Sequence, residues 1–596
     1  PRPSGGSLAT ARTYPELSLP AVLLGTVIGV TMTAAFTYIA LKLGFGLAGS
    51  TVAAILGFAV LRGAMGRRSI VENNVNQTIA SGVNTASAGV VFTLPALFLL
   101  SVGQPELAPF PIGAILFAAI AGSVMGIVLI IPLRKQMVEF ERLRFPSGVA
   151  VATLLRSPGE GLAQAQWLVI GAVGAVALTV LVNVGFIGEE VDLGHFIGLP
   201  AFVPFALYIS AANFGAGLLS GRGGLPFALG GILAWWVIAP IAVMSGWLPV
   251  SDGVPTHLVA GWQAEAVHGL MLRPLGIGLL IGGALAGVVA ALPAVRGALK
   301  SLAAAAAAAR ETGATPEELP PWALYSGAAL GFVLLVLASY FAAPELGAVR
   351  AVLIAIVGAL WLALAGVIVA QATGATDISP LSGLSLIAVT LMFFMTGGNV
   401  TAAIVIGVAV CVAINQCADM MSDLKSGHMV GSVPRLQQLG QLLMCWIGPL
   451  VAVGVVYLLW NSGVDGSPGF GAASVACQDA LPGCLPAPQA EALASTVDAL
   501  ATGDAPIDKY AAGAAIGAAV SVFPIGGLGV LLGLAMYLPF SITLGYGLGC
   551  VTAMGLEKQL GKRFIGRRLV PLAAGLIIGE ALTQIIWTFI TLGTGS

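Results

Sequence analysis

The residues best suited to chemistry in this chain are polar side chains that interrupt apolar sequence. The first group lies in VENNVNQTIASGVNTASAGVV, residues 71–91, and comprises Glu72, Asn73, Asn74, Asn76, Gln77 and Asn84. Amide side chains both donate and accept hydrogen bonds, so together they could line a cavity for a zwitterionic, hydrogen-bond-rich solute. The alternative is that they bond neighbouring helices at roughly 0.6 to 2 kcal/mol each.

The spacing of this first group favours one helix face. On a helix, Asn73, Gln77, Ser81 and Asn84 follow i, i+4, i+8 and i+11, so their side chains lie on the same side. Five carboxamides within twelve residues, with Glu72 at their head, exceed what contacts between helices require. We therefore expect a solute-lining face and an apolar remainder that faces lipid or partner helices.

The second group lies in QATGATDISPLSGLSLIAVTL, residues 371–391, and contains a helix start. Ser379 suits the N-cap and Pro380 the first helical position. The apolar run beyond is only about 15 residues long, whereas a full crossing needs about 20, so we predict a half-helix. Its positive dipole end would begin at depth beside Asp377, where a carboxylate group could bind. The alternative is that Asp377 caps an interfacial loop.

The third group lies in NQCADMMSDLKSGHMVGSVPRLQQ, residues 415–438, at a predicted helix end. Asp419 and Asp423 are four residues apart and so share a helix face. Two like charges in an enclosed site favour holding a proton between them, which suits proton handling. The alternative is a solvated loop, because Lys425 and Arg435 are near.

The fourth signal is Glu580 in LAAGLIIGEALTQIIWTFITL, residues 572–592. A charged side chain near the middle of an apolar span costs on the order of 2.5 to 3.5 kcal/mol on insertion scales, so a functional role is the first hypothesis. Burial favours the neutral acid, which suits a site that loads and unloads a proton. The alternative is a structural Glu bonded to a neighbouring helix.

The composition defines the elements that must position these groups. The 596 residues are 58% hydrophobic and 9% charged, against roughly 25% charged in soluble domains. Apolar runs of about 20 residues recur, so we predict an all-α polytopic membrane protein rather than a barrel. The net charge of -1 provides no basic field for nucleic acid.

We predict about 14 to 16 transmembrane helices. The first eight candidate spans are 20–43, 47–61, 75–102, 111–133, 167–186, 196–219, 226–247 and 274–292. The second eight are 322–341, 351–370, 381–395, 400–414, 436–460, 510–532, 535–550 and 569–592. The chain then divides into an amino tail 1–19, a first half 20–296, a linker 297–321 and a second half 322–596. The polar clusters recur in the same order in both halves, which favours two similar halves with discontinuous helices.

Loop charges predict the orientation. The basic residues after even-numbered spans, such as those at 62–68 and 134–144, place these loops and the amino terminus in the cytoplasm. The basic loop at 558–568 follows an odd-numbered span, so we expect that 535–550 is re-entrant or that one span is missing. The loop 461–509 then faces the outside, where Cys477 and Cys484 could form a disulfide.

Seven motifs, in order from about residue 20 to the end, resemble the oligopeptide transporter family, which includes the yellow stripe-like transporters of metal chelates. They are ENNVNQTIASGVNTASAGVVFTLPAL, LRFPSGVAVATLL, TGATDISPLSGLSL, DMMSDLKSGHMVGSVPRLQQ, LPAPQA, MYLPFSITLGYGLG and AAGLIIGEAL. Each motif is weak alone, but seven in register are specific. The long hydrophilic amino tail of plant members is missing, which together with the Ala-rich composition suggests a bacterial inner-membrane branch.

The resemblance implies secondary active transport, commonly proton-coupled, of small peptides or of metal bound to peptide-like chelators. Its motifs imply site residues at Glu72, Asn74, Gln77, Asp377, Ser379, Asp419, Asp423 and Glu580. We add Asn73, Ser81, Asn84, Gln371 and Tyr537 as substrate-binding candidates, and we assign proton coupling to Glu580, Asp377, Asp419 and Asp423. The expected partners are the substrate, protons and lipid, with a homodimer as the first expectation.

Two enzymatic alternatives fit less well. A membrane pyrophosphatase needs many carboxylates to hold several Mg²⁺ ions, whereas Asp419 and Asp423 are the only close pair of Asp residues in the predicted membrane region. An intramembrane hydrolase needs a nucleophile with a base, and the four histidines fall in predicted loops or interfaces. We therefore expect no enzyme, no cofactor and no bound metal ion.

Overall fold

The chain is described from a computed structural model of residues 1–596. The residues whose structure is described are 15–44, 49–67, 69–156, 161–188, 190–194, 198–199, 203–245, 250–251, 254–255, 267–290, 318–376, 379, 381–463, 467–471, 473–478, 485–502, 506–523 and 528–594.

The prediction of an all-α polytopic membrane protein is confirmed. Ten helices in the described ranges are long and apolar enough to cross a membrane, and five shorter apolar helices accompany them. Strands in these ranges form only two short antiparallel hairpins, β1 (Glu190–Asp192) with β2 (Ala206–Tyr208) and β3 (Val250–Ser251) with β4 (Val254–Pro255). Two similar halves stay a prediction.

The α-helices of the amino-terminal part are α1 (Leu19–Leu43), α2 (Gly49–Gly57), α3 (Ile70–Asn84), α4 (Ala86–Val91), α5 (Leu94–Gly103), α6 (Ile112–Ile130), α7 (Pro146–Leu155), α8 (Gly161–Asn183), α10 (Ala211–Ser220), α11 (Leu225–Ile232), α12 (Ala239–Met244) and α14 (Arg273–Ala290). Those that follow are α16 (Pro321–Ala342), α17 (Gly347–Thr376), α18 (Leu381–Met395), α19 (Val400–Val430), α20 (Pro434–Met444), α21 (Ile447–Trp460), α22 (Val475–Gln478), α23 (Pro488–Thr502), α24 (Ile507–Val520), α25 (Leu528–Tyr537), α26 (Phe540–Phe564) and α27 (Val570–Thr594).

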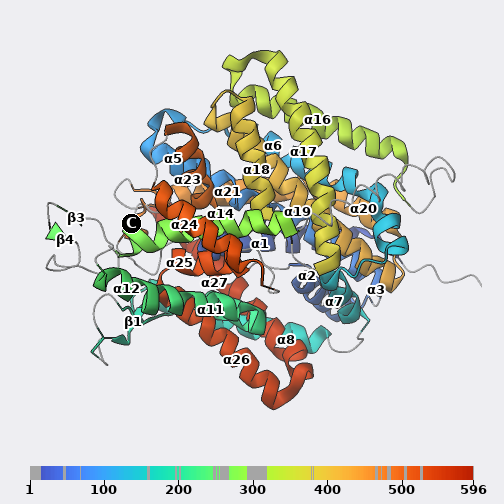
Figure 1. The fold of residues 1–596 in the computed structure, drawn as a ribbon. Helices are drawn as coiled ribbons and strands as arrows, with labels where there is room; N and C mark the ends of the chain where they lie inside the picture. Colours follow the sequence, from blue (N-terminus) through green and yellow to red (C-terminus); the bar gives the residue numbers. More distant parts are fainter. Residues whose placement is uncertain are drawn as a thin grey trace, which may run out of the picture.

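Helix α19 lies in the centre of the bundle and is almost entirely buried (Figure 1). It packs against α6, α17 and α18, and along its length against α3 and α4. Gly122 of α6 faces the backbone of Ala409, and a side-chain carbon at that glycine would clash with it. Close approach of this kind is what small residues permit between membrane helices, so α19 can be surrounded on all sides.

The amide group lies inside a helix rather than ahead of it. Helix α3 begins at Ile70, with Ser69 as its N-cap, and continues through α4 and α5 as one apolar segment to Gly103. Ile79 and Val83 are wholly buried and pack against α1, so the apolar remainder of α3 faces partner helices and not lipid.

Helix α19 also extends further than predicted, to Val430 instead of 414. Asp419 and Asp423 therefore belong to the helix, and Asp423 is 1% exposed. The alternative that these carboxylates lie in a solvated loop is wrong. The continuous i to i+4 hydrogen bonding of the helix overrides the polar composition of this stretch because neighbouring helices supply polar partners.

The predicted span 196–219 is wrong. In its described part the chain forms β2 and then α10, which Ser210 caps through a bond from Asn213 N. Helix α10 is only ten residues long and ends where Gly221 adopts φ +49°. Helix α11 then runs back along α26. Gly217 of α10 and Gly231 of α11 are 14 residues apart, yet they face Tyr546 and Thr543, which lie within one turn of each other on α26. The two helices therefore form a hairpin against α26.

The predicted single span 510–532 is also wrong, and so is the separate segment 535–550. Helices α24 and α25 replace the first as a hairpin packed on α14, with Gly529 of α25 facing Gly517 of α24. Helix α25 ends at Tyr537, and Pro539 precedes α26, which is interrupted near its end by a kink at Gly561 with φ +80°. The predicted count treated 510–532 as one crossing, whereas the hairpin of α24 and α25 returns to the side from which it starts. This difference of one crossing explains why the basic loop near 558–568 followed an odd-numbered span in the prediction.

The two ends of the bundle differ in charge. The segments that adjoin α2 and α7, together with the first turn of α20, carry the basic side chains of Arg62, Arg67, Lys135, Arg142, Arg144 and Arg435. We call this the basic end, and it lies at the right of Figure 1, whereas β1, β3, β4 and α12 lie at the left. By the positive-inside rule, this asymmetry in charge favours the predicted orientation, in which the basic end and the amino terminus face the cytoplasm.

Candidate functional site

A layer of polar side chains, all buried except the half-buried Ser50 and Asp419, lies between α2, α3, α19 and α20, nearer the basic end. We call it the polar layer, and it consists of Ser50, Asn73, Asn74, Asn76, Gln77, Ser81, Asn84, Asp419, Asp423, Ser426, Gln437 and Gln441. The structure thus brings the first and third sequence groups together, although more than 300 residues separate them in the chain.

Asp423 is the centre of the polar layer. Gln77 Nε2 donates to Asp423 Oδ1 at 2.6 Å, and Ser50 Oγ donates to the same oxygen at 3.4 Å. The other carboxylate oxygen has no hydrogen-bond partner among the described residues. A buried carboxylate with one free oxygen can accept a further donor, from a bound solute, from water or from a proton.

Other members of the polar layer bond neighbouring helices in this conformation. Asn73 Nδ2 donates to the carbonyl of Ala54 on α2 at 3.1 Å, and Asn74 Nδ2 donates to Ser426 Oγ on α19 at 2.9 Å. Asp419 accepts from Thr85 Oγ1 at 2.7 Å. These contacts are of the kind that hold membrane helices together.

Several buried atoms of this region nevertheless have no hydrogen-bond partner among the described residues. They are Asn74 Oδ1, Asn76 Oδ1, Asn84 Oδ1, Gln437 Oε1, and both polar atoms of Gln416 and of Gln441. Leaving one such atom unsatisfied costs about 1 to 3 kcal/mol, so a concentration of them points to a polar occupant. The polar layer can therefore solvate a molecule rich in hydrogen-bonding groups.

Glu72 lies apart from this layer. Arg67 Nε pairs with its Oε1 at 2.7 Å, and Ser18 Oγ donates to the same oxygen. Ser18 is the N-cap of α1 and Glu72 is in the first turn of α3, so the carboxylate ties the starts of two parallel helices together. Its position supports a structural role at the basic end.

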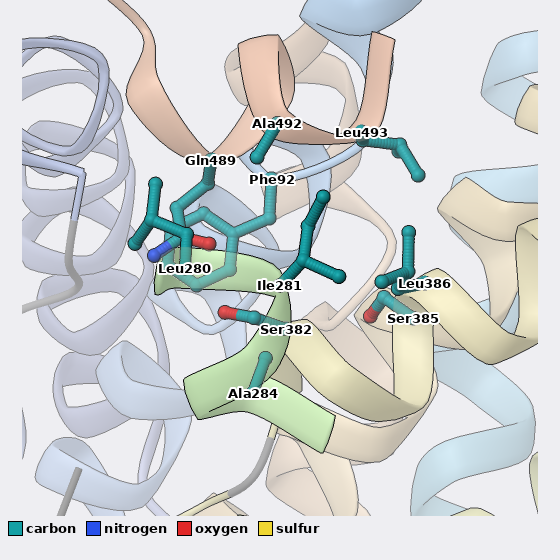
Figure 2. Close-up of a pocket in the computed structure, with 10 residues that line it drawn as sticks. All are labelled: Phe92, Leu280, Ile281, Ala284, Ser382, Ser385, Leu386, Gln489, Ala492 and Leu493. Carbon is teal, nitrogen blue, oxygen red and sulfur yellow. The ribbon is translucent and has the colours of Figure 1, made fainter. Parts of the chain in front are cut away.

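A small cavity of about 30 Å³, room for about one water molecule, lies where α14, α18 and α23 meet Phe92. Figure 2 shows the side chains converging on it from these elements. Its polar groups are Ser382 and Ser385 of α18 and Gln489 of α23, and the rest of its lining is apolar. The lining has the mixture of apolar and polar groups found in small-molecule sites, but a substrate group enters only if the cavity widens from its present size.

The predicted bounds of a short helix at residues 381–395 are confirmed, whereas its start at membrane depth stays a prediction. Helix α18 is 15 residues long and runs antiparallel to α19, with Val389 against Gly407 and Ser385 against Cys411. Its first turn therefore lies beside the middle of the 31-residue helix α19. The cavity is formed at this end of α18.

The remaining candidates of the second group lie near the start of α18. Ser379 shares a hydrogen bond of 2.6 Å with Thr373, and Gln371 Nε2 donates to Glu141 at 2.9 Å. Asp377 is outside the described residues. Tyr537 lies elsewhere: its hydroxyl donates to the carbonyl of Pro486 at 3.0 Å and its ring stacks beneath Arg273, so these contacts hold α25 against α14 and α23.

Glu580 is buried and has a cationic partner. Its Oε1 lies 3.0 Å from Nζ of Lys42, and its Oε2 accepts from the N–H of Ala212 at 2.9 Å. Ser210 Oγ is within 2.9 Å of both oxygens. The carboxylate therefore sits at the start of α10, where the helix dipole and a lysine both stabilise negative charge.

Sequence reasoning missed three groups of residues. Lys42 sits in the last turn of a span, where lysines commonly reach the interface, so nothing in the sequence marked it as buried. Gln437 and Gln441 lie in an amphipathic segment at spacing i, i+4, which was a readable signal. Gln489 belongs to the motif LPAPQA, but only the packing of α23 shows that it lines the cavity.

The cysteines fall into two groups, free cysteines that pack inside the bundle and a disulfide-bonded cysteine in the loop 461–509, as the sequence suggested. Cys411, Cys417, Cys445 and Cys550 are free and buried. Cys477 is disulfide-bonded. Cys484 is outside the described residues.

Comparison with known proteins places the chain in a family. The family described as "OPT oligopeptide transporter protein" matches residues 16–591. A relative in Haemophilus influenzae, named "Putative oligopeptide transporter", is 26% identical over 93% of this chain and 92% of its own length. The iron-phytosiderophore transporters of Oryza sativa and Zea mays are each 25% identical over 76% of this chain and over 73% and 72% of their own lengths. The chain therefore belongs to the oligopeptide transporter family, and it is a transporter rather than an enzyme.

Proposed function

We propose that this protein is a secondary active transporter that moves small peptides or peptide-like metal chelates across a bacterial inner membrane, driven by protons. The observation that carries the proposal is the polar layer. Its amides are buried among apolar helices, yet Asn74, Asn84 and Gln441 keep polar atoms without a partner among the described residues. A path for a peptide-like solute needs such groups, because peptide N–H and C=O groups lose their water on entering the membrane.

The cavity at the start of α18 supports a second part of this path. Ser382, Ser385 and Gln489 offer hydroxyl and amide groups, and Leu280, Ile281 and Phe92 offer apolar contact. A short peptide presents the same mixture of backbone amides and side chains. The names of the relatives include both an oligopeptide transporter and iron-phytosiderophore transporters, so both solute classes are retained.

Proton coupling is assigned to the buried carboxylates. Glu580 is the first candidate because protonation would cancel one half of a buried ion pair, and Asp423 is supported by its free carboxylate oxygen. Asp419 and Asp377 remain further candidates. The basic end is placed in the cytoplasm together with the amino terminus, following the positive-inside rule. A homodimer is the proposed assembly.

Substrate binding is tested by thermal stability of the detergent-purified protein. Di- to tetrapeptides and chelated Fe, Cu, Ni and Zn are added one at a time, and a specific ligand raises the unfolding temperature by mass action. The matched controls are the free metal salts, the free chelators and the constituent amino acids. Stabilisation by none of the peptides or chelates, or equally by their parts, would contradict the proposed substrate classes.

A further inference from the structure

The buried ion pair between Lys42 and Glu580 joins three helices at one point. Lys42 Nζ lies 3.0 Å from Glu580 Oε1 and donates to Tyr208 OH at 2.7 Å. Glu580 Oε2 accepts from Ala212 N, in the first turn of α10, at 2.9 Å, and from Ser210, the N-cap of α10. One carboxylate therefore holds the end of α1, the start of α10 and the middle of α27 together.

The surroundings of Glu580 are arranged for its ionised form. A protonated acid presents an O–H where Lys42 and Ala212 N already donate, so adding a proton removes at least one of these bonds. It also leaves the lysine cation buried without a counter-charge. The other titratable side chains facing the pair, within the described residues, are Tyr38 of α1 and Tyr208 of β2, whose rings lie 5.6 and 4.4 Å from Nζ. Neither ring replaces a full negative charge.

The end of α1 touches the segment that leads to the cavity. The carbonyl of Leu41 accepts from Ala487 N at 2.8 Å. Gly44 caps α1 at φ +76° and faces Pro488 so closely that a side-chain carbon would clash. Pro488 is the first residue of α23, and Gln489, the next residue, lines the cavity. A displacement of the end of α1 must therefore move α23 or break these contacts.

We infer that Lys42 is the positioning residue of a proton-sensing pair, and that the state of Glu580 reaches the cavity through the contact between α1 and α23. This inference rests on the proposed proton-coupled function. The proton binds a carboxylate oxygen of Glu580, no other covalent bond changes, and Lys42 is released from its counter-charge. The end of α1 is then free to shift against Pro488, which changes access to Gln489.

The test uses Gln489→Cys as a reporter and N-ethylmaleimide as the probe. The labelling rate of the purified full chain is measured at acidic and at neutral pH, and each rate is divided by that of a small free thiol, which removes the effect of thiolate fraction. With the pair intact, the corrected rates at the two pH values should differ by about threefold or more. In the Lys42→Met, Glu580→Gln background the two corrected rates should be equal.

Two further backgrounds separate proton sensing from loss of structure. Gln584→Leu removes a reciprocal amide contact of 3.1 and 3.2 Å with Asn183, one turn beyond Glu580 on α27, and should keep the pH dependence. Lys42→Arg keeps the cation and should also keep the pH dependence of labelling. Equal corrected rates with the pair intact, or the same pH dependence in the doubly substituted background, would overturn the inference.

The outcome is separable from that of the proposed function, because labelling requires no substrate. If uptake is driven by protons but the pH dependence of labelling is the same with and without the pair, only the inference about Lys42 is overturned. Pair-dependent labelling without any uptake of peptides or chelates would count against the proposed transport and leave the sensing pair in place.

Discussion

The polar layer and the pair of Lys42 and Glu580 are both buried among apolar helices, but they satisfy their polar atoms differently. In the pair, the ammonium and both carboxylate oxygens have partners within 3.0 Å. In the polar layer, Asn84 and Gln441 keep polar atoms with no partner among the described residues. The difference indicates that the pair is a closed contact, meaning that its polar atoms are satisfied within the chain and that, in the proposed function, it exchanges only a proton. The polar layer, by contrast, has polar atoms left over for a solute.

The largest predicted effect breaks the closed contact. Lys42→Met leaves the Glu580 carboxylate buried without its cation and should destabilise the protein by about 3 to 5 kcal/mol. The double substitution Lys42→Met, Glu580→Gln should recover most of this loss, since neither buried charge remains. Thermal unfolding of the detergent-purified variants checks both. A single variant as stable as the unmodified protein would show that the pair is not a closed contact.

The next effect is a difference in stability between two substitutions in the polar layer. Gln77→Leu removes the donor to Asp423 and should cost about 1 to 3 kcal/mol of stability. Asn84→Leu should cost less than about 1 kcal/mol, because Asn84 Oδ1 has no partner in the described residues to lose. Both should weaken substrate binding.

Thermal unfolding with and without ligand separates these effects. Equal destabilisation by the two substitutions, with unchanged affinity in the protein that remains folded, would favour a purely structural polar layer.

A smaller effect concerns the cavity. Gln489→Ala removes one amide from the lining and should weaken binding of the stabilising ligand by about threefold to tenfold, the value of one hydrogen bond. Stability without ligand should change little. Ala492→Ser, on the same helix and in the same lining, is the matched control and should leave affinity within about twofold. Unchanged affinity in Gln489→Ala would remove the cavity from the substrate path.

The smallest effect concerns the disulfide and the orientation. If the loop 461–509 lies outside the cytoplasm, Cys477 in intact cells should react with maleimide only after reductant is added. Immediate labelling would contradict the disulfide. Labelling that needs a permeabilised membrane would reverse the proposed orientation.

The all-α membrane fold and several helices follow from the sequence because apolar length is a strong and local signal. The start of α18 at Leu381 could be predicted from Ser379 and Pro380. The span 196–219 could not, because its apolar residues belong to a hairpin and to a ten-residue helix that is stabilised by contacts with α26 and α27. Hydropathy measures apolar content and does not show where a chain reverses.

In the candidate site, too, some residues could be predicted from the sequence and others could not. Glu580 was visible because a carboxylate in an apolar run is rare, and Gln77 and Asp423 were visible as members of polar groups. Their partners were not visible, because Lys42 lies 538 residues from Glu580 and Gln77 lies 346 from Asp423. Charge in a span predicts a function, whereas the partner that fixes its role is set by tertiary packing.

The most direct test of the proposed function is proton-driven uptake by Glu580→Gln in proteoliposomes. Gln has the size of the acid and resembles its protonated form, but it cannot take up or release the transported proton. With the ligand that gives the largest thermal stabilisation, the variant should still bind it and exchange it across the membrane. It should not accumulate that ligand under a pH gradient, whereas the unmodified protein should. Uphill, pH-driven uptake by Glu580→Gln at the unmodified rate would contradict the assignment of proton coupling to Glu580.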